Sequence, residues 1–175
     1  MAICILGMHR SGTSMITNLL YECGLYLGRR RDLMPPTEDN LRGYWENWRF
    51  VELNKKILAV AGGDWDRPPA LPAHEWMAHP ALVKLKSEAA KLIRDCGDHQ
   101  PWGWKDPRTN FTIPFWRELI PGLKMVVCLR YPLEVEASLR VRRNSPHWLG
   151  LTVWRMHNQF LLDHTTPAEK NHHSL

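Results

Sequence analysis

The first twenty residues constrain the fold more than any other part of the chain. Ala2–Leu6 is a short apolar run with β-branched side chains, which predicts a buried strand. Residues 7–12 form a polar loop with a glycine at each end. Residues 13–23 have helical spacing, with one apolar face expected to be buried: Met15, Ile16, Leu19, Leu20 and Cys23. A strand, such a loop and a helix N-terminus make an anion cradle, because unpaired N–H groups and the helix dipole face the loop.

The loop departs from the pattern of nucleotide hydrolases at one position. Their loop reads G-x-x-x-x-G-K-[ST], whereas Thr13 stands here in place of the lysine that neutralises the β and γ phosphates. The cations come earlier, at His9 and Arg10. A P-loop kinase acting on a small molecule is therefore a disfavoured alternative, and no carboxylate for Mg²⁺ is evident. For the loop alone, a plain glycine turn between strand and helix is an equal alternative.

Composition indicates one ordinary globular domain. The chain has 175 residues, 44% of them hydrophobic and 23% charged, with a formal net charge of +5. We expect a single domain over residues 1–164 and a disordered polar tail over 165–175. The positive charge suits an anionic ligand, but no basic run with interleaved aromatics indicates nucleic-acid binding. The cysteines lack metal-ligand spacing, so we expect buried thiols and no metal site: Cys4, Cys23, Cys96 and Cys128.

Alternation of strand and helix patterns predicts the architecture. Strand patterns lie at 102–105 and 124–129, and helical patterns precede, separate and follow them at 48–60, 82–96, 112–119, 133–142 and 149–162. The run at 124–129 is almost wholly apolar and is expected to be a central parallel strand. The prediction is an α/β fold, a three-layer α/β/α domain with a central parallel sheet, like the P-loop nucleoside triphosphate hydrolases. Ligands of such sheets bind beyond the carboxyl ends of the strands.

Two further strand ends carry cations toward that edge. Arg130 follows one strand, and Ser138 lies eight residues on, in the next helix, so the two could grip one phosphate. Arg142, one turn further, could add charge. Lys105 ends another strand, before Asp106-Pro107. The alternatives are a surface arginine with an unrelated serine, and a solvated strand-end lysine.

These segments together resemble the sulfotransferases that use 3′-phosphoadenosine 5′-phosphosulfate (PAPS). Residues 7–14 resemble their 5′-phosphosulfate loop, the Arg130–Ser138 spacing resembles their 3′-phosphate site, and residues 105–107 resemble a Lys-Asp-Pro segment of tyrosyl-protein and carbohydrate sulfotransferases. Residues 43–46 and 151–160 also look like bacterial members. The resemblance implies transfer of a sulfuryl group from PAPS to a hydroxyl acceptor, with adenosine 3′,5′-bisphosphate (PAP) as product. Family members usually continue past the last helix of this chain with a segment that helps enclose nucleotide and acceptor.

The resemblance also implies residue roles. Cofactor binding is expected from His9, Arg10, Ser11, Gly12, Thr13, Ser14, Arg130, Ser138 and Arg142. Arg10 and Lys105 would stabilise charge on the bridging and sulfuryl oxygens. Glu46 is the first choice for the base that takes the acceptor's proton, with Glu38, Asp39 and His9 as rivals. For Glu46 the equal alternative is a carboxylate at a helix N-terminus without a chemical role.

Other expectations concern acceptor and location. Tryptophans placed in or beside loops suit sugar rings and favour a carbohydrate or glycolipid acceptor, with ordinary core residues as the alternative: Trp45, Trp48, Trp65, Trp76, Trp102 and Trp104. No secretory signal or membrane span is visible, which suggests a cytoplasmic enzyme, since Golgi sulfotransferases carry an anchor. The oligomeric state is open. A shortened, non-catalytic nucleotide-binding module is the second alternative function.

Overall fold

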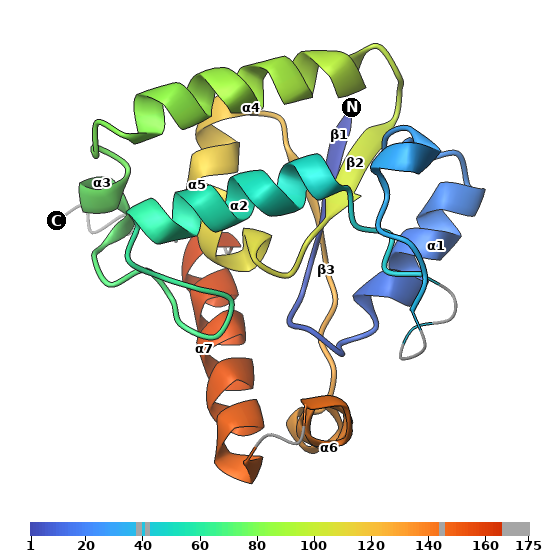
Figure 1. Ribbon diagram of the computed structural model, residues 1–175, viewed down its shortest axis with the longest axis vertical. Coiled ribbons are helices and arrows are strands. Elements are labelled where there is room, and N and C mark those ends of the chain that lie inside the picture. Colours follow the sequence, from blue (N-terminus) through green and yellow to red (C-terminus); the bar gives the residue numbers. More distant parts are fainter. Residues whose placement is uncertain (38–39, 41–42, 144–145, 166–175) are drawn as a thin grey trace, which may run out of the picture.

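The computed structural model describes residues 1–37, 40, 43–143 and 146–165, and strands alternate with helices along it (Figure 1). The elements in chain order are β1 (Ala2–Leu6), α1 (Thr13–Glu22), the 3-10 turn η1 (Arg30–Asp32), α2 (Trp48–Val60), α3 (Ala73–Trp76), α4 (Leu82–Gly97), β2 (Trp102–Lys105), α5 (Thr109–Leu119), β3 (Lys124–Val127), α6 (Pro132–Arg143) and α7 (His147–Thr165). The predicted α/β class is confirmed. Helix α5 begins three residues earlier than expected, and the short helix α3 lies between the helices predicted at 48–60 and 82–96.

The three described strands form one parallel sheet in the order β2–β1–β3. Strand β1 pairs on both sides, and most of it is buried. Strand β3 lies at the edge, and Val127 is 47% exposed. The prediction of a central strand at 124–129 is therefore wrong in both place and length. None of the residues of β3 is buried, and the strand pairs on one side only, so an apolar run does not by itself identify a central strand.

A glycine lets β1 and β2 approach closely. Gly103 lies opposite Ile3, and a Cβ at Gly103 would stand 2.2 Å from the carbonyl oxygen of Ile3. The same register places Lys105 beside Ile5, one residue before the end of β1. The end of β2 therefore delivers Lys105 to the loop that follows β1.

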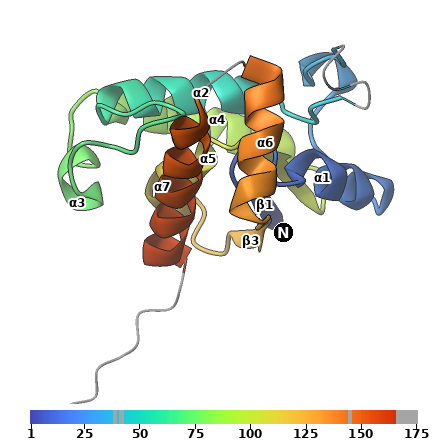
Figure 2. The ribbon, with the colours of Figure 1, turned by 90° about the horizontal axis from the view of Figure 1, so that it is seen from below.

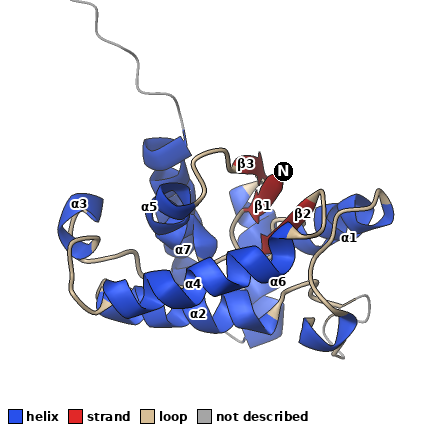
Figure 3. Cartoon of the chain, turned by 90° about the horizontal axis from the view of Figure 1, so that it is seen from above, coloured by secondary structure: helices blue, strands red, loops and turns tan. Residues whose placement is uncertain are grey.

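Helices lie on both sides of the sheet. Figures 2 and 3 show α1 on one side of the strands and α5 with α7 on the other, an arrangement compatible with three layers. The main core contains stacked aromatic rings from α2, β2 and α5. The Phe50 and Trp104 rings are 4.7 Å apart and nearly parallel, and Trp116 packs against both. No helix among the described residues has both the length and the apolar composition to cross a membrane.

The buried face of α1 differs from the prediction. Met15 and Leu19 are 61% and 54% exposed, whereas Thr17 is fully buried. The hydroxyl of Thr17 can be buried because it donates to the carbonyl oxygen of Thr13, at 2.7 Å. Cys23 is exposed, so the expectation of a buried thiol is wrong there. It is confirmed for the other cysteines: Cys4, Cys96 and Cys128.

Candidate functional site

The loop after β1 has the backbone of an anion cradle. Gly7, Arg10 and Gly12 all have positive φ angles, of 142°, 70° and 84°. A Cβ at Gly7 would stand 2.6 Å from the carbonyl oxygen of Cys128, so only glycine fits there. Arg10 is strained, because side chains other than glycine rarely adopt φ near 70°. Gly12 precedes α1 without a side chain to cap it, so the first amides of α1 remain available to an anion.

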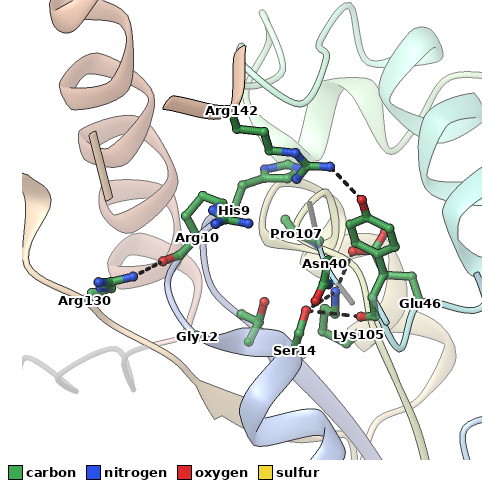
Figure 4. Close-up of a pocket in the computed structure, with 12 residues that line it drawn as sticks. His9, Arg10, Gly12, Ser14, Asn40, Glu46, Lys105, Pro107, Arg130 and Arg142 are labelled. Carbon is green, nitrogen blue, oxygen red and sulfur yellow. Dashed lines mark hydrogen bonds and ion pairs between the residues drawn. The ribbon is translucent and has the colours of Figure 1, made fainter. Parts of the chain in front are cut away.

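Cations surround a cavity of about 210 Å³ in front of this loop (Figure 4). The cavity wall includes His9 and, among the described residues, the side chains of three arginines and one lysine: Arg10, Lys105, Arg130 and Arg142. Glu46 is the one carboxylate among the described residues of the wall. These residues come from the loop, the end of β2, the segment before α2, the segment between β3 and α6, and the last turn of α6. The fold thus brings the three sequence segments together around one cavity, whose wall has more basic than acidic side chains among the described residues.

Lys105 and Glu46 form a buried ion pair within this wall. The Lys105 Nζ lies 2.5 Å from Glu46 Oε1, and the two residues are 1% and 8% exposed. Burial raises the pKa of the Glu46 carboxyl, and the Lys105 ammonium opposes part of that rise. Lys105 Nζ also lies 3.4 Å from Ser14 Oγ, in the first turn of α1. The pair therefore stands where the helix N-terminus meets the end of β2.

A buried polar network fixes the segment that follows Lys105. The Asp106 carboxylate accepts from Asn54 Nδ2 at 2.9 Å and from Arg108 Nη1 at 2.8 Å, and it has no exposed surface. Asn54 also donates to Thr109 Oγ1, at 2.9 Å. Since Asn54 lies on α2 and Thr109 on α5, both helices are locked to the end of β2. This network holds Lys105 in position without reaching the cavity.

Ser138 meets a different arginine from the one expected. Its hydroxyl accepts from Arg10 Nε at 2.7 Å, and Ser138 does not line the cavity. Arg130 donates through Nη1 to the carbonyl oxygen of Arg10, at 3.2 Å, and through Nε to Glu134, at 2.8 Å. The three predicted residues thus form one cluster, in which Ser138 orients Arg10 while Arg130 stays on the wall.

The remaining predicted residues divide between the cavity wall and its surroundings. Gly12, Thr13 and Ser14 line the cavity, whereas Ser11 is buried within the loop and does not. Arg142 Nη2 donates to the Tyr44 hydroxyl at 2.9 Å, and this bond between two residues of the cavity wall connects α6 to the segment before α2. Glu38 and Asp39 lie outside the described residues.

The tryptophan prediction needs correction. Trp76, Trp102 and Trp104 are buried in the core, so they have no free ring face for an acceptor. Trp48, at the start of α2, is exposed, but it does not line the cavity. Trp65 packs edge-on against His9, with ring centroids 5.2 Å apart. Tryptophan content therefore gives little support for a sugar acceptor.

Sequence reasoning missed three side chains around the loop. Asn110 accepts the N–H of Gly7, His157 lies behind Asn110, and Tyr44 contacts Arg142. Their signal in the sequence is weak, because a polar residue such as Asn110 in a helix has many ordinary explanations. Among the described residues, no group of three or more His, Cys, Asp and Glu side chains is placed to hold a metal ion. Comparison with protein-family models, curated proteins and solved structures found no match for this chain.

Proposed function

We propose that this protein is a sulfotransferase of the P-loop-like, three-layer α/β/α type, which moves a sulfuryl group from PAPS to a hydroxyl acceptor. One observation carries the proposal. The glycine-bounded cradle has no lysine of its own, and the buried Lys105 from the neighbouring strand stands 3.4 Å from Ser14 in its first helical turn. A kinase of the P-loop class would need a loop lysine and Mg²⁺ to neutralise its triphosphate. A sulfuryl group carries less negative charge than a phosphoryl group, so side-chain cations suffice.

The residues of the wall suit the anionic parts of PAPS. The first amides of α1, with the side chains of Thr13 and Ser14, would hold the 5′-phosphosulfate. Arg130, on the same wall, would hold the 3′-phosphate, with Arg142 adding charge. The left-handed backbone at Arg10 and Gly12 fits this use, because such turns make anion-binding concavities. When bound, PAPS supplies the sulfuryl group, whose bond to the bridging oxygen breaks as the bond to the acceptor oxygen forms.

The buried ion pair gives Lys105 and Glu46 linked roles. A base must take the proton of the acceptor hydroxyl, and burial raises the pKa of Glu46 toward a useful value. Once Glu46 is protonated, it no longer neutralises Lys105. The ammonium then acts with its full charge on the bridging oxygen, at the moment that negative charge develops there. Proton removal and charge stabilisation are thereby coupled through one 2.5 Å contact.

Calorimetric binding of PAP, ADP and ATP tests the proposal. We expect wild-type protein to prefer PAP, and Arg130→Ala to weaken PAP binding by about tenfold or more, since a charged hydrogen bond contributes about 1.5–3 kcal/mol. Arg155→Ala is the matched control, because Arg155 is exposed on α7 and does not line the cavity. Equal binding of the three nucleotides would refute the cofactor assignment. Selective PAP binding without transfer to any acceptor would identify a non-catalytic nucleotide-binding module.

A further inference from the structure

A chain of buried hydrogen bonds runs behind the cradle loop. The Gly7 N–H donates to Asn110 Oδ1 at 2.9 Å, and Asn110 Nδ2 lies 2.8 Å from His157 Nδ1. The other ring nitrogen, His157 Nε2, lies 2.7 Å from the carbonyl oxygen of Trp65. Neither Asn110 nor His157 has exposed surface. The chain therefore joins the end of β1 to α5, α7 and the segment after α2.

Its two ends fix the direction of every bond. The Gly7 N–H can only donate, so the Asn110 oxygen must face it and the Asn110 amide must donate to His157 Nδ1. The Trp65 carbonyl can only accept, so His157 carries its single proton on Nε2. Burial lowers the pKa of His157 to about 4, so the ring stays neutral in neutral solution. One tautomer of one imidazole thus satisfies both neighbours.

His157 also supports a side chain of the cavity wall. The Trp65 ring, whose carbonyl His157 holds, meets His9 at a centroid distance of 5.2 Å and an interplanar angle of 79°. His157 itself lies 6.2 Å from His9, at 88°. His9 lines the cavity. His157 is therefore linked to Gly7, at the start of the cradle loop, by way of Asn110. Its ring also lies next to the His9 ring on the cavity wall.

We propose that His157 is a positioning residue for the anion cradle, which holds the Asn110 amide that anchors Gly7 and keeps Trp65 against His9. The inference rests on the proposed function only in that it takes the cradle as the anion site. If Nδ1 carried the proton, two N–H donors would face each other, because Nδ1 lies opposite the Asn110 amide nitrogen. The side-chain amide of Asn110 would then flip by 180°. Its nitrogen would then face the Gly7 N–H, and the loop would lose its anchor.

Two substitutions test the two hydrogen bonds of the His157 ring separately. Asparagine at position 157 keeps an acceptor near the place of Nδ1, whereas glutamine keeps a donor near the place of Nε2. His157→Asn thus retains the link to Asn110, and His157→Gln retains the link to Trp65. The control is Thr112→Val, which removes a buried hydrogen bond from Thr112 Oγ1 to Asn54 Oδ1 (2.7 Å) on the same helix as Asn110.

Calorimetric titration with PAP measures the effect on the cradle. We expect the Kd to rise about fivefold in His157→Gln and less than twofold in His157→Asn and Thr112→Val, since one anchoring hydrogen bond contributes about 1 kcal/mol. Equal losses in the two His157 variants, or an equal loss in Thr112→Val, would overturn the proposal, because general loosening of the fold would then explain them.

A measurement without nucleotide separates this inference from the proposed function. Nitrogen-15 NMR of the wild-type imidazole at pH 7 should show a proton on Nε2 of His157 and none on Nδ1. The Gly7 amide should be slow to exchange in wild type and in His157→Asn, and fast in His157→Gln. The opposite tautomer, or unchanged Gly7 exchange in His157→Gln, refutes the positioning role. If this pattern appears but wild type does not bind PAP, only the proposed function fails.

Discussion

Removing one partner of the Lys105–Glu46 pair should destabilise the fold far more than removing both. The pair is almost wholly buried, with an N–O distance of 2.5 Å and side chains 2% and 10% exposed. Lys105→Met leaves the Glu46 carboxyl buried without its cation. Glu46→Gln leaves the Lys105 ammonium buried without its anion. A broken buried pair loses about 3–5 kcal/mol, whereas replacing both groups by neutral ones of similar volume is often close to neutral.

Urea denaturation of the two single variants and the double variant measures this coupling. With a slope of about 2 kcal/mol per molar urea, each single change should lower the midpoint by about 1.5–2.5 M. The double variant should return to within about 1 kcal/mol of wild type. The Lys56–Glu88 pair provides a control, because its N–O distance is 2.8 Å but its side chains are 54% and 35% exposed. There Lys56→Met should lose less than about 1 kcal/mol. Additive losses at Lys105 and Glu46 would refute the reasoning.

Three further predictions concern acid, glycine and thiol chemistry. Burial holds the pKa of His157 near 4 against 6.5 in the unfolded chain, so stability falls as pH drops from about 6.5 toward 4. By pH 5 wild type should lose about 2 kcal/mol more than His157→Asn in urea melts, and equal losses would contradict this. Gly103→Ala should abolish folding, because its Cβ would meet a carbonyl oxygen at 2.2 Å, whereas Gly12→Ala should lose only about 1–2 kcal/mol through its left-handed φ. Circular dichroism distinguishes these outcomes. A thiol reagent should modify only Cys23 in native protein and all four cysteines in urea, and a second fast native thiol would contradict the burial of the other three.

Local signals were sufficient for the strand–loop–helix at the N-terminus. The β-branched run of β1 and the glycines at positions 7 and 12 specify it without help from distant residues. Helix α2 begins at Trp48 as predicted, because the Asn47 side chain accepts from the Arg49 N–H and caps it. The cations at strand ends were also predictable, since parallel strands bring their carboxyl ends to one edge.

Burial and side-chain partners depend on distant segments and were not predictable. The apolar side chains Met15 and Leu19 looked like a core face, but they are exposed, and the buried residues of α1 are Thr13 and Thr17. Asn110 and Gly7 are 103 residues apart, and no periodicity indicates which helix presents an amide to that loop. For the same reason the sequence paired Ser138 with Arg130, although Ser138 accepts from Arg10 in the structure.

The source of the lysine has a consequence for binding. Lys105 does not belong to the cradle loop: it comes from the adjacent strand, is buried and is already paired with the Glu46 carboxylate. An anion in the cradle must therefore compete with Glu46 for the ammonium. Glu46→Gln should bind PAP several-fold more tightly than wild type, although it is less stable and, under the proposed mechanism, lacks the base and loses turnover. Weaker PAP binding by Glu46→Gln, with the fold intact by circular dichroism, would mean that Glu46 orients Lys105 toward the anion and does not compete for it.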